Sequence, residues 1–416
     1  MTIEKRYRKT KQGGRGLLVF FTIQCLLFLL DFFLTANPYS ANHSGHTGAD
    51  SNIMSDSYFI QTNIITAVSI FCTYFYLNKL KLVLPLFPLY FAIWIFFSGT
   101  LNHAILEHTK SYFYDAILPF LVAGIAYYDF RGFYNPEKLR ILFWGIFGFV
   151  LLGVILALVK PQVWGYLPFA FSRVERGENS LAAISAAHII LPAMALSISS
   201  LSKNLRLLVY IFMLFLALSV MTRTLIVYSI SPLLLYVFFR TKGFSRYILI
   251  FLALVVCYSG FLFLIDSILL SSSKQTVLEA SLTGRYELWE YYWKQLWESP
   301  FIGKGAFMLA SPTSTYTGLA NSEIGVLKTA TEYGIPAAIL QSVLVVLANI
   351  SAFRILTNNK SNDLEILTSL LAITLTLGFL IEDHYRILST QNFVFWYSIF
   401  FLVFKRYPRL RFRVDI

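Results

Sequence analysis

Two arginines are the residues of this sequence best suited to bind an anion. Arg285 follows Thr283 and Gly284 and opens an aromatic stretch, and Arg223 stands at the centre of the apolar block 207–239. A guanidinium presents a planar fork of donors that matches phosphate oxygens in pairs. The residue types therefore indicate a phosphate site. A structural ion pair at Arg223 is the alternative reading of that residue.

The stretch 286–298 has the spacing of a helix with one aromatic face. Its rings recur at steps of three and four residues, at Tyr286, Trp289, Tyr292, Trp293 and Trp297. Such a helix is expected to lie along a membrane surface with its rings at headgroup depth. Its first amides and Arg285 would together favour a phosphate at that depth, where a lipid-linked diphosphate lies. A helix that only braces the bundle is the alternative.

Glu323 is the residue that we expect to act as a base. It follows Asn321 and Ser322 and precedes a helical pattern that carries Glu332. A carboxylate within hydrogen-bond reach can take the proton of an attacking hydroxyl. A counter-ion for nearby arginines is the other interpretation.

Further polar residues are expected on the same side of the membrane as Arg285 and Glu323. Glu382 and His384 are the next candidates for the base, in the densest short charged cluster outside the expected inner loops. The additional substrate-binding candidates are Arg173, Arg176, Lys304, Glu382, His384 and Arg386.

Composition places most of the chain in a membrane. Of 416 residues, 57% are hydrophobic and 13% are charged. Runs of sixteen or more residues with few charges recur, and about 20 apolar residues in a helix span the hydrocarbon core. The expected fold class is all-α, a polytopic helical membrane protein.

Twelve spans account for the apolar runs. The block 207–239 is interpreted as two short spans, because a single span would put the later basic segment 240–246 on the wrong side of the membrane. Arg223 then lies at the tip between them, and its charge is not left in lipid, where it would be costly. The polar segment 37–57 is expected to be an outer loop. The spans are expected at 17–36, 58–77, 82–99, 112–127, 141–159, 179–200, twice within 207–239, then at 247–266, 335–356, 364–381 and 393–404.

Positive charge orients these spans. The segments assigned to the inner side carry 23 of the 34 Lys and Arg residues, and cytoplasmic loops are enriched in these residues. Both ends are therefore expected inside, with basic tails at 1–16 and 405–416. Nine spans fill 17–266, a long outer loop that could hold the chemistry follows at 267–333, and three spans fill 334–404. The net charge of +12 thus reports membrane insertion, and nucleic acid is not expected as a partner.

No metal or cofactor is expected. The three cysteines, Cys25, Cys72 and Cys257, lie singly in apolar runs and form no ligand spacing. A magnesium site would want clustered aspartates, and no Asp-x-Asp pair occurs in 267–333.

Several short motifs, taken in order, resemble the large periplasmic loop of the O-antigen polymerase and ligase superfamily. Their order along the chain is more specific than any one of them. They are Leu282-Thr283-Gly284-Arg285, Trp289 in the aromatic run, Ser299-Pro300, Gly303-Lys304-Gly305, Asn321-Ser322-Glu323 and Gly334-Ile335-Pro336, with Asn179 to Ala182 and Thr222-Arg223 upstream.

This resemblance implies a metal-independent, inverting glycosyltransferase of the membrane-embedded GT-C class. Its substrates would be glycans linked to undecaprenyl diphosphate, in a bacterial inner membrane with the site facing the periplasm. In the family, arginines hold the diphosphate, which implies that role for Arg223 and Arg285. The implied partners are these glycans, membrane lipids and a chain-length regulator protein.

The motif around Glu323 separates the two members of the superfamily. Ligases carry a His eleven residues before the glycine that corresponds to Gly334, and Glu323 occupies that position here. The resemblance therefore favours a polymerase of lipid-linked repeat units over a ligase that transfers glycan to lipid A core. A polysaccharide flippase is the rival from another class, but we find no internal repeat of the kind typical of transporters.

Overall fold

The computed structural model confirms the all-helical fold class. It describes residues 14–34, 51–78, 83–102, 109–132, 135–159, 181–220, 223–240, 247–248, 251, 255, 285–305, 325–358, 360–381, 390–407 and 411–413. These ranges hold thirteen helices and two strands of three residues each.

The helices of the bundle coincide with the apolar runs of the sequence. They are α1 (Arg15–Leu34), α2 (Ser51–Asn78), α3 (Leu86–Leu101), α5 (Thr109–Arg131), α6 (Pro136–Val159), α8 (Leu181–Ser197), α9 (Lys203–Val220), α10 (Arg223–Arg240), α16 (Ile335–Thr357), α17 (Asp363–Ile381) and α18 (Thr390–Arg406). The predicted run 247–266 lies almost wholly outside the described residues.

Two helix boundaries can be compared with the spans and loops expected from the sequence. The block 207–239 is divided into α9 and α10, as predicted, and Arg223 is the first residue of α10. The polar segment 37–57 is shorter than expected, because α2 already begins at Ser51. No Gly or Pro stands between Ser51 and Tyr58, so nothing in the local sequence stops the helix from extending beyond its apolar part.

One described helix, α16, is long and apolar enough to cross a membrane by length and composition alone. Shorter apolar helical stretches lie in α1, α2, α3, α8 and α10. The described residues thus form a helical bundle with membrane-like composition, and the count of twelve spans stays a prediction.

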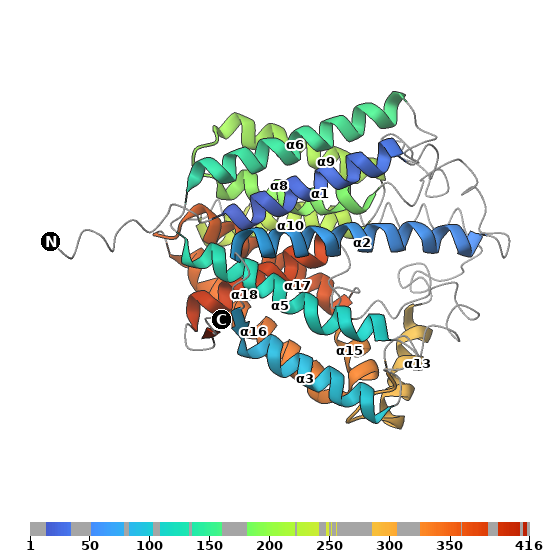
Figure 1. Ribbon diagram of the computed structural model, residues 1–416. Coiled ribbons are helices and arrows are strands. Elements are labelled where there is room, and N and C mark those ends of the chain that lie inside the picture. The colour runs from blue at the N-terminus through green and yellow to red at the C-terminus, as the bar shows by residue number, and fades with distance from the viewer. Residues whose placement is uncertain are drawn as a thin grey trace.

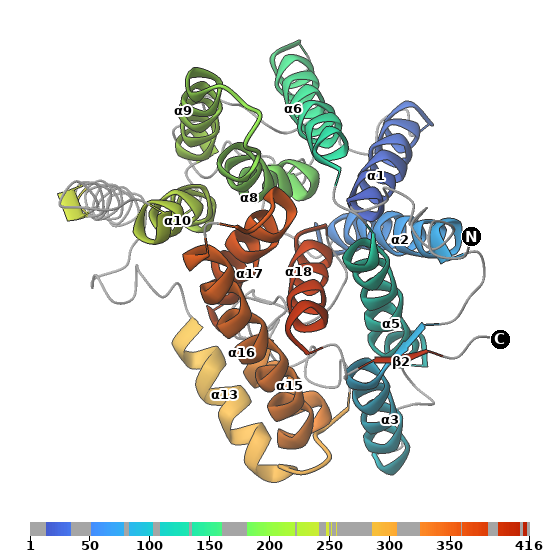
Figure 2. The ribbon, with the colours of Figure 1, turned by 90° about the vertical axis from the view of Figure 1, so that its left-hand side faces the viewer.

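Helix α18 forms the centre of the bundle. Its side chains from Asn392 to Phe404 are all buried, as expected for a helix that is apolar all round. It packs against α5, α8, α16 and α17, and Figure 2 shows it in the middle of the bundle, seen along the helices. Aromatic side chains pack against one another here, for example Phe20 stacked on Phe393.

Two shorter described helices lie between α10 and α16 in the chain. They are α13 (Arg285–Glu298) and α15 (Gly325–Tyr333), and both had been predicted as helical from the sequence. Figure 1 shows α13 running across the direction of α2 and α6, at the end of the bundle where α3 ends. Helix α15 packs between α13 and α16.

Asp129 ties three helices together at the opposite end. Its carboxylate accepts hydrogen bonds from the backbone N–H groups of Gly16 (2.8 Å) and Leu17 (3.2 Å) and from the hydroxyl of Tyr397 (2.7 Å). The first N–H groups of a helix have no partner within it, so Asp129 of α5 caps α1 from a neighbouring helix. At the same end, β1 (Val83–Pro85) pairs antiparallel with β2 (Arg411–Arg413).

We expect Asp129→Ala to destabilise the bundle by about 2–4 kcal/mol, because it leaves two buried N–H groups and one hydroxyl without their acceptor. Thermal unfolding of the purified protein in detergent measures this loss. Glu137→Ala is the control, since Glu137 is exposed on the neighbouring α6. Equal melting temperatures of the two variants would contradict the capping role.

Candidate functional site

The end of α15 is joined to a turn that comes from the end of α13. A helix leaves its last four carbonyls without partners inside the helix, and all four are satisfied here. Ala330 accepts from Gly334 N (2.9 Å), Thr331 from Lys304 N (2.7 Å), Glu332 from Gly305 N (3.0 Å) and Tyr333 from the indole N–H of Trp94 (2.8 Å). In return, Ile335 N donates to Pro300 O (2.8 Å).

We call this arrangement the clamp, comprising the turn 299–305 and the α15–α16 junction 331–335. It brings together two of the motifs that the sequence singled out, Gly303-Lys304-Gly305 and Gly334-Ile335-Pro336. The two glycines at the contact are required by geometry. Gly303 has φ +72° and Gly334 has φ +89°, a region that other L-residues rarely adopt. A Cβ on Gly303 would overlap the Glu332 carbonyl, and one on Gly334 the Phe301 carbonyl.

Helix α3 holds the clamp from the side. The side-chain amide of Asn102 donates to the carbonyls of Ile302 and Gly303, both at 2.9 Å, and Trp94 donates to Tyr333 O as described. Ser299 adds a bond from its hydroxyl to Gly303 O (2.7 Å). The hydrogen bonds from Asn102 and Trp94 therefore attach the clamp to α3.

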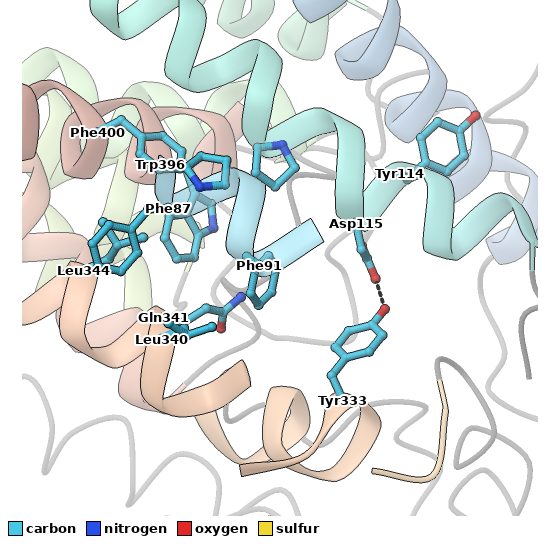
Figure 3. A pocket seen from close by; sticks show the side chains of 12 residues that line it. Phe87, Phe91, Tyr114, Asp115, Tyr333, Leu340, Gln341, Leu344, Trp396 and Phe400 are labelled. Atoms are coloured by element: carbon cyan, nitrogen blue, oxygen red, sulfur yellow. Dashed lines mark hydrogen bonds between the residues drawn. The ribbon is translucent and has the colours of Figure 1, made fainter. Parts of the chain in front are cut away.

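Helix α5 reaches the clamp through Asp115. Figure 3 shows the hydroxyl of Tyr333 pointing at this carboxylate and donating a hydrogen bond to it. Tyr333 is fully buried and Asp115 is 9% exposed. The ring of Tyr333 also meets Tyr112 edge-on, with centroids 5.8 Å apart. The contact joins residues 218 positions apart in sequence.

Beside this bond lies a pocket that is mostly apolar. Its lining comes from α3, α5, α16 and α18, with Tyr333 at one edge. Among its polar groups, Gln341 accepts a hydrogen bond from Thr329 (2.8 Å) and Asp115 accepts the one from Tyr333. These groups join helices to one another, so we place no chemistry in this pocket.

A second and more open groove runs between α13 and α16. Trp293, Leu296 and Trp297 of α13 form one wall, and α15 and the α16 residues from Ile335 to Leu347 form the rest. Apart from Ser342, every lining residue is apolar. Trp293 and Trp297 remain more than half exposed. The groove therefore suits an apolar chain.

Two ion pairs involve glutamates of α13. Lys304 Nζ contacts Glu298 (2.6 Å) and Lys294 Nζ contacts Glu290 (2.8 Å). The hydrogen bond from Lys294 to Glu290 raises the pKa of Lys294, so it stays charged. Burial, reinforced by Glu298, raises the pKa of Tyr291. Among the described residues, no group of three or more His, Cys, Asp and Glu could hold a metal ion.

The structure places three of the predicted site residues. Arg223 and Arg285 are the first residues of α10 and α13, so each lies where helix N–H groups favour an anion. Lys304 lies by Glu298 at the other end of α13, and about 20 Å of helix separates it from Arg285, at 1.5 Å per residue. The two cations would therefore touch different parts of a substrate. Outside the described residues lie Arg173, Arg176, Glu323, Glu382, His384 and Arg386.

Four residues of this site were not among the predicted ones: Trp94, Asn102, Asp115 and Tyr333. A signal existed for Asp115, because it is a carboxylate inside the predicted span 112–127, and ionisable residues within spans are rare and usually functional. No local pattern marks the other three.

A comparison with known protein families matches the part of the chain that contains this site. A family model described as O-antigen ligase matches residues 208–341, the segment that contains α10, α13, the clamp and α15. The match confirms the resemblance to the O-antigen polymerase and ligase superfamily and indicates a polymerase- or ligase-type function on polysaccharide. A search of curated proteins found no match to the chain.

We expect Gly334→Ala to open the clamp and to lower stability by about 3 kcal/mol, from the strained backbone and the lost hydrogen bonds. Thermal unfolding in detergent measures the effect. Gly148→Ala is the matched control, because a Cβ at Gly148 of α6 meets nothing within 4 Å and Ala favours a helix by about 0.5–1 kcal/mol. If Gly334→Ala melts like Gly148→Ala, the clamp does not constrain the fold.

Proposed function

We propose that this protein polymerises oligosaccharide repeat units linked to undecaprenyl diphosphate. As a metal-independent, inverting glycosyltransferase of the GT-C class, it would transfer a growing glycan from one lipid diphosphate to the terminal sugar of another repeat unit. The family match to 208–341 supports polymerase or ligase chemistry, and the finer assignment rests on the arguments below.

The observation that carries the proposal is that the clamp lies within the family-matched segment. The chain leaves the clamp at Gly305 and enters α15 at Gly325, so the intervening segment, which contains Glu323, starts and finishes on described elements of one small region. The hydrogen-bonded clamp beside this segment suits a reaction whose rate depends on orientation.

The proposed step balances as a direct displacement. The acceptor hydroxyl oxygen bonds to the anomeric carbon of the donor sugar, and the bond from that carbon to the diphosphate oxygen breaks. Glu323 takes the hydroxyl proton. Arg223 and Arg285, each at a helix N-terminus, stabilise the charge that develops on the departing undecaprenyl diphosphate. The donor is already activated, so no cofactor enters the balance.

The groove between α13 and α16 gives the lipid tail of the donor a place. Its lining extends along α16 from Ile335 to Leu347, about 18 Å at 1.5 Å per residue. That is comparable with one leaflet of a hydrocarbon core about 30 Å thick. Because α13 begins at Arg285 and forms a wall of the groove, the tail and the diphosphate can be held by one helix.

A polymerase fits the sequence of the matched segment better than a ligase. The resemblance implies a His in the ligases where Glu323 stands here, and 208–341 contains no His at all. We therefore propose a carboxylate, that of Glu323, as the base. We further propose an inner-membrane location with the site facing the periplasm, supported by the charge split of the loops. A chain-length regulator remains a predicted partner.

Purified protein in nanodiscs should convert lipid-linked repeat units into a ladder of longer glycans, seen by gel electrophoresis. Addition of lipid A core should not divert the product to that acceptor. Transfer to lipid A core without a ladder would replace the polymerase by the ligase. The absence of any new glycosidic product would refute both.

In that assay, Glu323→Gln should lower the rate by about a hundredfold or more, because it removes the proton acceptor and keeps the shape. Arg285→Lys should abolish most polymer, since Lys cannot form the paired contact to phosphate. Glu290→Gln on α13 and Arg354→Lys at the far end of α16, both exposed, are the controls and should retain activity. Wild-type turnover by either test variant would remove that residue from the mechanism.

Filling the groove should weaken binding of long-tailed donors selectively. We expect Ser342→Trp to raise KM about tenfold for a donor with the full undecaprenyl tail and to change KM little for a donor with two isoprene units. Ile350→Trp is the control, because Ile350 is exposed on α16 beyond the groove. Equal KM values of the two variants for the long donor would exclude the groove as the tail site.

A further inference from the structure

We propose that Asp115 is a positioning residue for the transfer reaction and acts through Tyr333. By holding Tyr333, it fixes the clamp against the bundle. This inference rests on the proposed function, because it needs a reaction that the clamp serves.

Tyr333 is bonded from two helices at once. Its carbonyl accepts the indole N–H of Trp94 from α3, and its hydroxyl donates to Asp115 of α5. Its neighbours Glu332 and Gly334 make the backbone contacts of the clamp. A shift of this residue therefore moves the α15–α16 junction and the turn 299–305 together.

The bond to Asp115 also joins α5 to the clamp. Asp115 and Tyr333 are both buried, and a buried hydroxyl that loses its acceptor has a strong tendency to find another. Without Asp115, Tyr333 would keep its edge contact with Tyr112 but would lose the hydrogen bond from its hydroxyl to α5. Reactions of this type are sensitive to such changes, since a displacement of about 1 Å can cost a hundredfold in rate.

The same helix provides an internal control. Asp129 accepts a hydrogen bond from the buried Tyr397 (2.7 Å), which is the same pair of groups at the other end of α5. The two carboxylates are 14 residues apart, about 21 Å along the helix at 1.5 Å per residue. Tyr397→Phe therefore removes a similar bond far from the clamp.

The experiment compares Tyr333→Phe with Tyr397→Phe in nanodiscs with lipid-linked repeat units. Both should lower the melting temperature by a similar amount. Tyr333→Phe alone should lower kcat, by about tenfold or more, with KM for the donor changed less than twofold. If both variants have the same kcat per folded protein, the contact is only structural and the inference is overturned.

A second set of variants keeps the test valid if a single one fails to fold. Asp115→Asn keeps an acceptor oxygen and should retain more turnover than Asp115→Ala. The double variant Asp115→Ala with Tyr333→Phe should be no slower than the slower single variant, because both act through one bond. Additive losses would overturn the inference. An inactive wild-type protein would instead refute the proposed function.

Discussion

The structure around the candidate site depends on the satisfaction of backbone polar groups where α15 ends and α16 begins. Four carbonyls and the first N–H of the next helix must find partners in a mostly apolar molecule. The turn 299–305 supplies three of these partners, Trp94 supplies one, and Gly334 supplies the last. Because such groups are expensive to leave unpaired when buried, the turn has one favourable position. The direction in which α13 leaves it follows from that position.

The elements of the fold could be predicted because their signals are local. Long apolar runs gave the helices of the bundle, and the aromatic spacing of 286–298 gave α13. The division between α9 and α10 could be predicted from charge, since a single span would put the basic segment 240–246 on the wrong side of a membrane and would leave Arg223 in lipid. The glycines at 303 and 334 could be noted in the sequence, but what they approach could not.

The contacts that build the site could not be predicted because they join distant residues. Asn102 meets Gly303 across 201 positions, and Tyr333 meets Asp115 across 218. A hydrogen bond of this kind leaves no periodicity in either segment. The antiparallel pairing of β1 with β2 is hidden for the same reason, since three residues on each strand are too few to show alternation.

Polar contacts have a particular weight in a bundle of this composition. Where most helix faces are apolar, hydrophobic burial does little to choose between alternative packings, and hydrogen bonds between helices add specificity. Helix α5 carries one carboxylate near each end. Asp129 joins α5 to α1 and α18, and all three are helices of the bundle. Asp115 reaches beyond the bundle to the clamp. The two similar bonds thus have different consequences, because one joins helices within the bundle and the other joins α5 to the α15–α16 junction.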